Sequence, residues 1–310
     1  MQTTTMQGDF GAVLTADPGE KVEGIDAGTV KSLIKAHGTV LFRGFEASRS
    51  DFDTFTDRIN DDYMNYKGGG YVRKTVGADG KSGEDGKALL STRYDHGREK
   101  QMTFGLPLHG EMYYIDHRPA LLWFFCVKPA DNDGQTTACD GAEVYSRLPQ
   151  KWKDLLHEKR LMFQRVYRDG EWQKIYQTDD IAEARAFCAD NGLTTEFDAE
   201  KTLRTHYKVH AVLPTRWGDH TAYINNLLPV MMQQKMGRGD TSTVRFEDGS
   251  DIPDDLIADV ERIQDAVILN LDWGAGDFAL IDNSRALHGR RAFEDTDREV
   301  YLRMVRSAPF

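Results

Sequence analysis

Residues 106–114 read LPLHGEMYY, and residues 281–293 read IDNSRALHGRRAF. The first stretch places His109 and Glu111 one residue apart, and the second supplies His288. Two imidazoles and one carboxylate can occupy one face of an octahedral metal and leave the other face open, which is the arrangement that binds non-haem iron(II). The sequence therefore predicts a metal centre built from His109, Glu111 and His288.

The flanking residues indicate how these ligands can converge. Side chains at positions i and i+2 of an extended strand point to the same side, so a strand here would aim His109 and Glu111 at one ion. Gly110, between them, keeps the opposite side of that strand uncrowded. Two long apolar runs that read as buried strands occupy 118–130 and 276–282. A distant strand can therefore deliver His288 as the third ligand.

Length and composition exclude several classes of protein. The 310 residues, 40% hydrophobic and 29% charged, suffice for one large domain with a sizeable core. A net charge of -11 and a pI of about 5.3 argue against binding to nucleic-acid phosphates. No apolar stretch has the length of a membrane span, and the N-terminus does not read as a secretory signal. Cys126, Cys139 and Cys188 form neither a disulfide framework nor a zinc spacing, so we expect a cytoplasmic protein.

The pattern of elements predicts a mainly β fold with flanking helices (α+β) and a double-stranded β-helix, or jelly-roll, core. Apolar periodicity and end signals predict helices at 28–37, 50–60 (Ser50 as N-cap), 141–156, 178–191 and 253–266. We expect a single domain over 1–310, with a loop or lid insertion around 65–105 and a helical insertion around 178–266. Glycine-rich loops open at low cost, so the part over 67–87 is expected to be a lid that excludes water.

Several stretches together resemble one protein family. They are TVLFRGF (39–45), YKGGGYVR (66–73), LHGEMYY (108–114), FFCVKPADNDGQTTACDGAEVYSRLP (124–149) and WGAGDFALIDNSRALHGRRAF (273–293). In this order they resemble the TauD/TfdA-type dioxygenases that depend on iron(II) and 2-oxoglutarate, and in particular their SyrP-like branch. The resemblance runs from about Val40 to the C-terminus. It implies a jelly-roll enzyme that uses iron(II), 2-oxoglutarate and O2.

The resemblance also implies where 2-oxoglutarate binds. The family places an arginine on the strand after the distal histidine, and an arginine can bond both oxygens of a carboxylate. Arg298 and Arg303 are the candidates in DREVYLR. They are five residues apart, so on an undistorted strand only one reaches the site. The family motif favours Arg298, and Thr136 matches a threonine that holds the same carboxylate.

Substrate contacts are expected around the metal motif. Arg73 ends YKGGGYVR and could clamp a substrate carboxylate. Other candidates, which follow Glu111 or correspond to polar pocket positions in the resembling branch, are Tyr113, Tyr114, Asp116, Asn225 and Asn226.

The expected reaction is hydroxylation of an unactivated C–H bond in an amino acid or an amino-acid-derived small molecule, free or bound to a carrier protein, in natural-product biosynthesis. Desaturation, epoxidation and cyclisation are alternatives with the same cofactors. Halogenases of this fold have a small residue in place of the carboxylate ligand, so Glu111 argues against halogenation. From other classes, a non-catalytic jelly-roll binding protein and a metal-dependent cupin-like isomerase remain open. The sequence specifies neither the substrate nor the oligomeric state.

Overall fold

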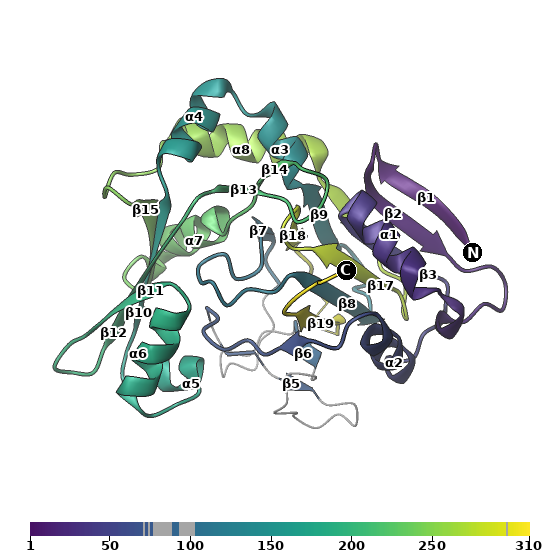
Figure 1. Ribbon diagram of the computed structural model, residues 1–310, viewed down its shortest axis with the longest axis horizontal. Coiled ribbons are helices and arrows are strands. Elements are labelled where there is room, and N and C mark those ends of the chain that lie inside the picture. Colours follow the sequence, from purple (N-terminus) through teal and green to yellow (C-terminus); the bar gives the residue numbers. More distant parts are fainter. Residues whose placement is uncertain (71, 74, 77–88, 93–102, 296) are drawn as a thin grey trace.

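The larger of two facing sheets forms one layer of the molecule. The computed structural model (Figure 1) describes residues 1–70, 72–73, 75–76, 89–92, 103–295 and 297–310. In spatial order the strands are β1 (Gln2–Gln7), β2 (Phe10–Thr15), β3 (Thr39–Arg43), β17 (Phe278–Asp282), β8 (Leu121–Lys128), β19 (Glu299–Val305), β6 (Leu89–Ser91) and β5 (Thr75–Val76), with β4 (Tyr63–Met64) paired to β19. All five residues of β17 are buried. Both faces of this strand are covered, which explains why its apolar run is continuous.

The smaller sheet lies opposite and is antiparallel throughout. Its order is β16 (Leu269–Leu271), β9 (Thr136–Asp140), β18 (Ala286–Arg290) and β7 (Leu106–His109). Phe124 of β8 meets His288 of β18 across the gap, with ring centroids 5.6 Å apart. The two sheets therefore enclose the residues that the sequence marks as functional, in the expected jelly-roll arrangement.

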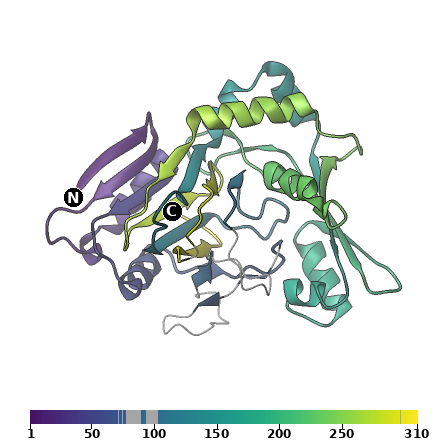
Figure 2. The same cartoon turned by 180° about the vertical axis from the view of Figure 1, so that it is seen from behind.

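Helices cover the outer faces of both sheets. Helix α1 (Ala27–His37) and helix α2 (Arg49–Ile59) pack on the larger sheet, where phenylalanines of α2 meet Trp123 and Phe278. Helix α8 (Asp254–Val267), yellow-green in Figure 2, lies over the smaller sheet with α3 (Gly141–Arg147) and α4 (Gln150–Glu158) nearby. None of the described helices has the length and apolarity needed to cross a membrane.

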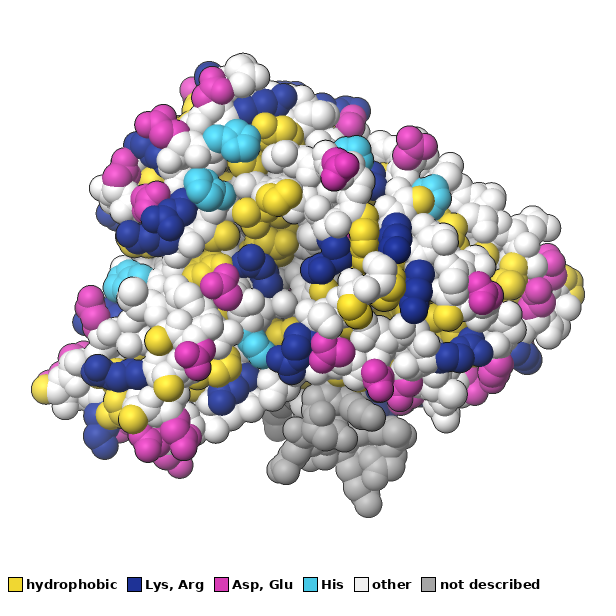
Figure 3. All heavy atoms as spheres, viewed as in Figure 1, with side chains coloured by type: hydrophobic (Ala, Val, Ile, Leu, Met, Phe, Trp, Pro, Cys, Tyr) yellow, Lys and Arg dark blue, Asp and Glu magenta, His cyan; other side chains and the backbone are white. Residues whose placement is uncertain are grey.

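A third sheet stands beside the jelly roll. It consists of β11 (Leu193–Phe197), β12 (Leu203–Val209), β10 (Leu161–Tyr167) and β15 (Ser242–Phe246), with α5 (Trp172–Tyr176) and α6 (Ile181–Asp190) against it. The short pair β13 (Val212–Pro214) and β14 (Thr221–Tyr223) leads back to the core. The segment 178–266, expected as a helical insertion, holds strands β11 to β15 as well as helices α6, α7 (Leu227–Gln233) and α8. In Figure 3 hydrophobic side chains gather in a hollow near the middle of the face, among interspersed acidic and basic ones.

Two local expectations need correction, and one pair of strands was not expected. Helix α2 is capped by Ser48 and not by Ser50, because Asp51 at the third helical position accepts from the Ser48 backbone while Ser48 Oγ accepts from Asp51 N. The helix expected over 141–156 is two helices, since Pro149 cannot continue the first. The N-terminal strands β1 and β2 have no counterpart among the sequence expectations.

The glycine-rich stretch expected to act as a lid lies largely outside the described residues. Within the wider insertion around 65–105, the described strands β5 and β6 extend the edge of the larger sheet. Part of this segment is thus sheet, and β6 brings Ser91 and Thr92 to the cavity between the sheets.

Candidate active site

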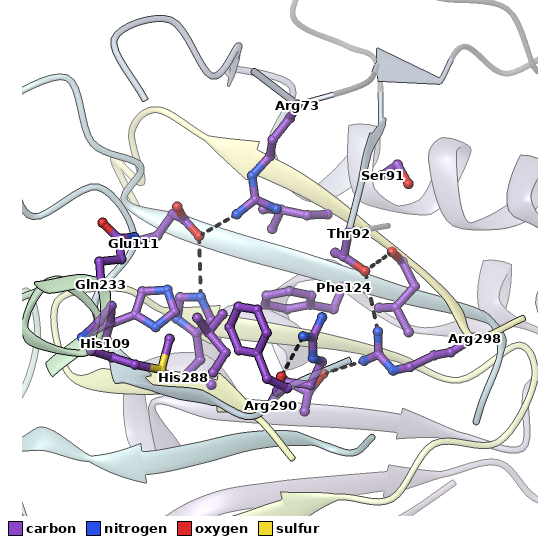
Figure 4. Close-up of a pocket in the computed structure, with 18 of the residues that line it drawn as sticks. Arg73, Ser91, Thr92, His109, Glu111, Phe124, Gln233, His288, Arg290 and Arg298 are labelled. Atoms are coloured by element: carbon purple, nitrogen blue, oxygen red, sulfur yellow. Dashed lines mark hydrogen bonds and ion pairs between the residues drawn. The ribbon is translucent and has the colours of Figure 1, made fainter. Parts of the chain in front are cut away.

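Three buried side chains meet between the sheets (Figure 4). His109 is the last residue of β7 and His288 lies on β18, where the two are direct partners in the antiparallel register. Their ring centroids are 4.4 Å apart. Glu111 completes the group: its Oε2 lies 3.4 Å from His288 Nε2, and one donor atom from each residue lies within 4.8 Å of the others. The structure thus brings together the three predicted ligands.

The expected reason for this convergence is wrong in one respect. Strand β7 ends at His109, and Glu111 lies in a turn in which Met112 has a φ of 60°. Glu111 is held instead by Asn283, whose Oδ1 accepts from Glu111 N (2.8 Å) and whose Nδ2 donates to Glu111 O (3.1 Å). The carboxylate is therefore positioned by a side chain from the loop that precedes β18, not by strand geometry.

Gly110 is needed because of a close neighbour. A Cβ at this position would lie 2.4 Å from Cδ2 of Tyr113. The Tyr113 ring is fixed there, since its hydroxyl donates to Asn283 O (2.8 Å). Any other residue at position 110 would displace the turn that carries Glu111.

The protonation states of the triad suit a divalent metal. His109 Nδ1 donates to the Pro107 carbonyl (2.8 Å), which leaves the lone pair on Nε2 for a ligand bond. Burial and the neighbouring His288 lower the pKa of His109 to about 4, so the ring is neutral at pH 7. Burial raises the pKa of the Glu111 carboxyl, but Arg73 and the two histidines outweigh it and lower this pKa to about 2. Imidazole nitrogens and an ionised carboxylate are a donor set that fits iron(II).

A second polar group lines the same cavity, around Arg298. Arg298 Nε donates to Gly134 O (2.8 Å), and its Nη atoms lie 3.5 Å from the hydroxyls of Thr92 and Thr136. Burial and the charge of Arg290 lower the pKa of Arg298 to about 10, which still leaves it charged at pH 7. A buried guanidinium in the cavity fits the distal carboxylate expected of 2-oxoglutarate.

Thr136 is oriented to assist. Its Oγ1 accepts from Trp273 Nε1 (3.0 Å) and faces Arg298 Nη2. Because a hydroxyl has one hydrogen and these contacts use its lone pairs, the Thr136 O–H can donate to an anion in the cavity. The tryptophan that sets this orientation was not among the sequence candidates.

Arg303 does not reach the cavity, which corrects the expectation that it is a candidate for binding 2-oxoglutarate. Its Nη1 lies 2.6 Å from Thr56 Oγ1, 3.0 Å from Asp57 and 3.5 Å from Asp53, all on α2. Strand β19 shifts register between its first two residues, yet Arg303 still points to the outer face of the larger sheet. Of the two arginines, Arg298 alone lines the cavity.

Among the substrate candidates, Arg73 is at the site. Its Nη2 lies 3.6 Å from Glu111 Oε2, and its guanidinium stacks over the Tyr66 ring at 4.6 Å. Figure 4 shows it descending towards Glu111 from the segment opposite the histidines. An arginine that reaches a proposed metal ligand can also reach a substrate group beside the metal.

The other substrate candidates are engaged elsewhere, and none of them lines the described cavity. Asp116 accepts from the Tyr207 hydroxyl (2.5 Å). Asn225 Oδ1 accepts from Leu227 N at the start of α7 (Leu227–Gln233), and Asn225 Nδ2 donates to Ala211 O. Tyr113, Tyr114 and Asn226 likewise form buried hydrogen bonds within the fold. The structure does not support the expectation that these residues contact the substrate, because their side chains are used in contacts within the fold.

The sequence reading missed one wall of the cavity. It is formed by α7 and the π-helical turn η2 (Gln234–Arg238) and contributes Pro229, Met232, Gln233, Met236 and Arg238. Its sequence, LLPVMMQQKMGR, reads as an ordinary apolar helix end and gives no signal of a binding surface. Arg290, which stacks over Phe293, was missed as well.

Comparison with known proteins decides the family. The family model described as "Taurine catabolism dioxygenase TauD, TfdA family" matches residues 2–306. The chain belongs to this family. This TauD/TfdA protein is therefore a dioxygenase, as predicted, and the predicted iron(II) and 2-oxoglutarate fit the donor set and the buried arginine described above.

Relatives of this TauD/TfdA dioxygenase share sequence over most of their length. A clavaminate synthase-like protein of Arabidopsis thaliana is 27% identical over 284 residues, covering 86% of this chain and 81% of the relative. The dapdiamide synthesis protein DdaC of Enterobacter agglomerans is 23% identical over 292 residues, covering 89% and 84%.

Solved structures share the fold at low sequence identity. PvcB of Pseudomonas aeruginosa matches 98% of this chain and 89% of its own, with a TM-score of 0.59 and 17% identity. The structure of AAD-2 with Mn(II) and N-oxalylglycine matches 98% and 96%, with a TM-score of 0.58 and 12% identity. The jelly-roll prediction is thereby confirmed.

Proposed function

We propose that this dioxygenase hydroxylates an unactivated C–H bond of an amino acid or amino-acid-derived small molecule, whose carboxylate is bound by Arg73. The observation that carries the proposal is the position of the Arg73 guanidinium, 3.6 Å from the Glu111 carboxylate and stacked on Tyr66. A substrate carboxylate bound there would place the neighbouring carbon atoms beside the metal centre. A planar guanidinium is suited to such bidentate binding.

Each part of the site has one task in this proposal. His109, Glu111 and His288 bind iron(II), and Arg298 with Thr136 binds the distal carboxylate of 2-oxoglutarate. When bound, iron and 2-oxoglutarate supply the oxidation of a C–H bond by O2, with the keto acid converted to succinate and carbon dioxide. Glu111 Oε2 now faces both Arg73 and His288. A metal that takes up this carboxylate leaves Arg73 to pair with the substrate.

The wider setting of the reaction is also a proposal. One relative is named a dapdiamide synthesis protein, and PvcB is described as an oxygenase from an isonitrile synthetic pathway. These names support a role in natural-product biosynthesis, with a substrate that is free or is bound to a carrier protein through a carboxyl group other than the one at Arg73. The three cysteines are free and buried, which fits a reducing cytoplasm.

A substrate screen tests the proposal. The enzyme is incubated with iron(II), 2-oxoglutarate, O2 and a panel of amino acids, N-modified amino acids and carrier-protein thioesters. We expect succinate to form together with a product that gains one oxygen atom. A product that loses two hydrogens would indicate desaturation or cyclisation instead. A chlorinated product in chloride buffer would contradict the role of Glu111 as a ligand, and absence of succinate with every compound would contradict the function.

A further inference from the structure

The described residues that line the cavity include more basic than acidic side chains. Among its described lining residues are four arginines, Arg73, Arg238, Arg290 and Arg298, and one acid, Glu111. The charges of iron(II) and 2-oxoglutarate would cancel each other. Charge of one sign in a cleft attracts ligands of the opposite sign. The substrate side of the cavity therefore favours more than one anionic group.

Arg238 differs from the other three arginines in its place. It ends η2 and is solvent-exposed, at the mouth of the cavity and not between the sheets. The structure records no ion pair between it and any acid of the described residues. Its backbone is fixed, since Arg238 O accepts from both N and Oγ1 of Thr241 at 3.1 Å. Gly237, with a φ of 82°, interrupts the helical geometry of η2 one residue before Arg238.

Exposed apolar side chains flank the same mouth. Met236 is 58% exposed and Val72 is 47% exposed, the two highest values among the large hydrophobic residues that the structure describes. Both line the cavity, from opposite segments, and each stands close to an arginine in sequence: Met236 to Arg238 and Val72 to Arg73. Exposed apolar groups beside a cleft commonly mark a binding surface. A ligand spanning this mouth would meet an apolar surface between two guanidinium groups.

The distance from this mouth to the metal centre is fixed by α7. The helix is tied to the metal-binding turn at its start, because Asn225 O accepts from Gly110 N (2.9 Å) and Asn226 Oδ1 accepts from Tyr113 N (3.0 Å). At its far end, Gln234 Oε1 accepts from Val244 N of the third sheet (3.2 Å). A group bound at Arg238 would thus lie at a set separation from the carbon to be oxidised.

We infer that the substrate carries a second anionic group, remote from the oxidised carbon, and that Arg238 binds it. This inference rests on the proposed function and narrows its substrate class to molecules with an anion at each end and an apolar stretch between. The second anion is a carboxylate, as in a dicarboxylic N-acyl amino acid, or a phosphate, as in an amino acid whose side chain or N-acyl group ends in a phosphate ester. Arg238 is then a specificity-determining residue and takes no part in the oxidation itself.

The test compares matched substrates that differ at the distal end alone. Each parent amino acid is supplied with a neutral, carboxylate, phosphate or ammonium group at the end remote from its own carboxylate. For the wild type we expect kcat/KM to be about tenfold or more higher with a distal anion than with the neutral group. The carboxylate and phosphate arms show which anion is used. Arg238→Glu should abolish this preference, mainly through KM, and favour the distal ammonium. Arg204→Glu, at an exposed arginine on β12 outside the cavity, is the matched charge-reversal control and should behave as the wild type.

Binding is measured separately by calorimetry without O2, in the presence of iron(II) and 2-oxoglutarate. Tighter binding of the distal anions to the wild type, lost in Arg238→Glu, supports the inference even if turnover is slow. Equal binding and turnover of neutral and anionic compounds, with equal losses in Arg238→Glu, would overturn it and leave the proposed function standing. No succinate from any compound overturns the proposed function, and the binding comparison then still decides the role of Arg238.

Discussion

The side-chain amide of Asn283 bonds to both backbone groups of Glu111, 172 residues earlier in the chain. The same amide donates to Pro119 O (2.8 Å), and Asn283 O accepts from the Tyr113 hydroxyl (2.8 Å). Asn283 lies five residues before His288. One short segment therefore carries His288 and also fixes Glu111 through the side chain of Asn283. The geometry of the triad therefore depends on a residue that would not contact the metal.

Replacing Asn283 should damage both stability and the metal site. Asn283→Ala leaves buried N–H and C=O groups of Glu111 without their partner, which typically costs about 1–3 kcal/mol for each such group. We expect a clear fall in the denaturation midpoint and weaker iron(II) binding. Asn132→Ala, an exposed amide in a loop, is the control and should change neither. Unchanged iron affinity in a folded Asn283→Ala protein would show that Glu111 needs no such support.

Metal binding should stabilise the fold through the three proposed ligands. A ligand that binds the folded state at a concentration of about 100 Kd adds about 2.7 kcal/mol to the free energy of unfolding. We therefore expect iron(II), or manganese(II) under air, to raise the Tm of the wild type but not of Glu111→Ala or His288→Ala. His220→Ala, at an exposed histidine, should keep the shift. In a crystal structure of the loaded enzyme the three donors should lie about 2.0–2.2 Å from the ion.

The ligands could be predicted from sequence because their residue types and their place in the motif are specific. The contacts that hold these ligands in position could not be predicted. The expectation that a distant strand delivers His288 agrees with the structure, in which His109 and His288 are register partners on neighbouring strands. The strand argument placed Glu111 correctly for the wrong reason, since the turn and its Asn283 contact depend on two segments far apart in sequence. No local pattern records such a contact.

The sequence left open the direction in which several polar side chains point. The sequence places Arg298 and Arg303 on opposite sides of one strand, and the family motif favours Arg298 for the cavity. The ion pairs of Arg303 with α2 show that Arg303 faces away from the cavity. Asn225 was expected to face the substrate, and instead its Oδ1 accepts from Leu227 N at the start of α7. Polar residues next to a motif can point towards the ligand or hold the motif in place, and the spacing is the same in both cases.

Substitutions at Arg298 and at Arg303 should have opposite effects on 2-oxoglutarate binding and on stability. Arg298→Ala removes the buried cation that faces Thr136, so we expect the KM for 2-oxoglutarate to rise about tenfold or more, with iron(II) binding retained. Arg303→Ala leaves Asp53, Asp57 and Thr56 without their shared partner. It should lower stability and leave the KM for 2-oxoglutarate near the wild-type value. Steady-state kinetics and thermal denaturation of both variants check this, and the reverse pattern would assign the cosubstrate to Arg303.

Arg73 should affect the substrate and not the cosubstrate. Arg73→Ala removes the guanidinium above Glu111, and the loss of a charge-assisted hydrogen bond of about 1.5–3 kcal/mol corresponds to a rise of roughly tenfold to a hundredfold in the substrate KM. Arg73→Lys keeps the charge without the bidentate fork and should recover part of this loss. Because Arg73 also helps to lower the pKa of the Glu111 carboxyl, iron(II) affinity is measured for each variant to separate the two effects. A higher KM for 2-oxoglutarate with an unchanged substrate KM would mean that Arg73 serves the cosubstrate instead.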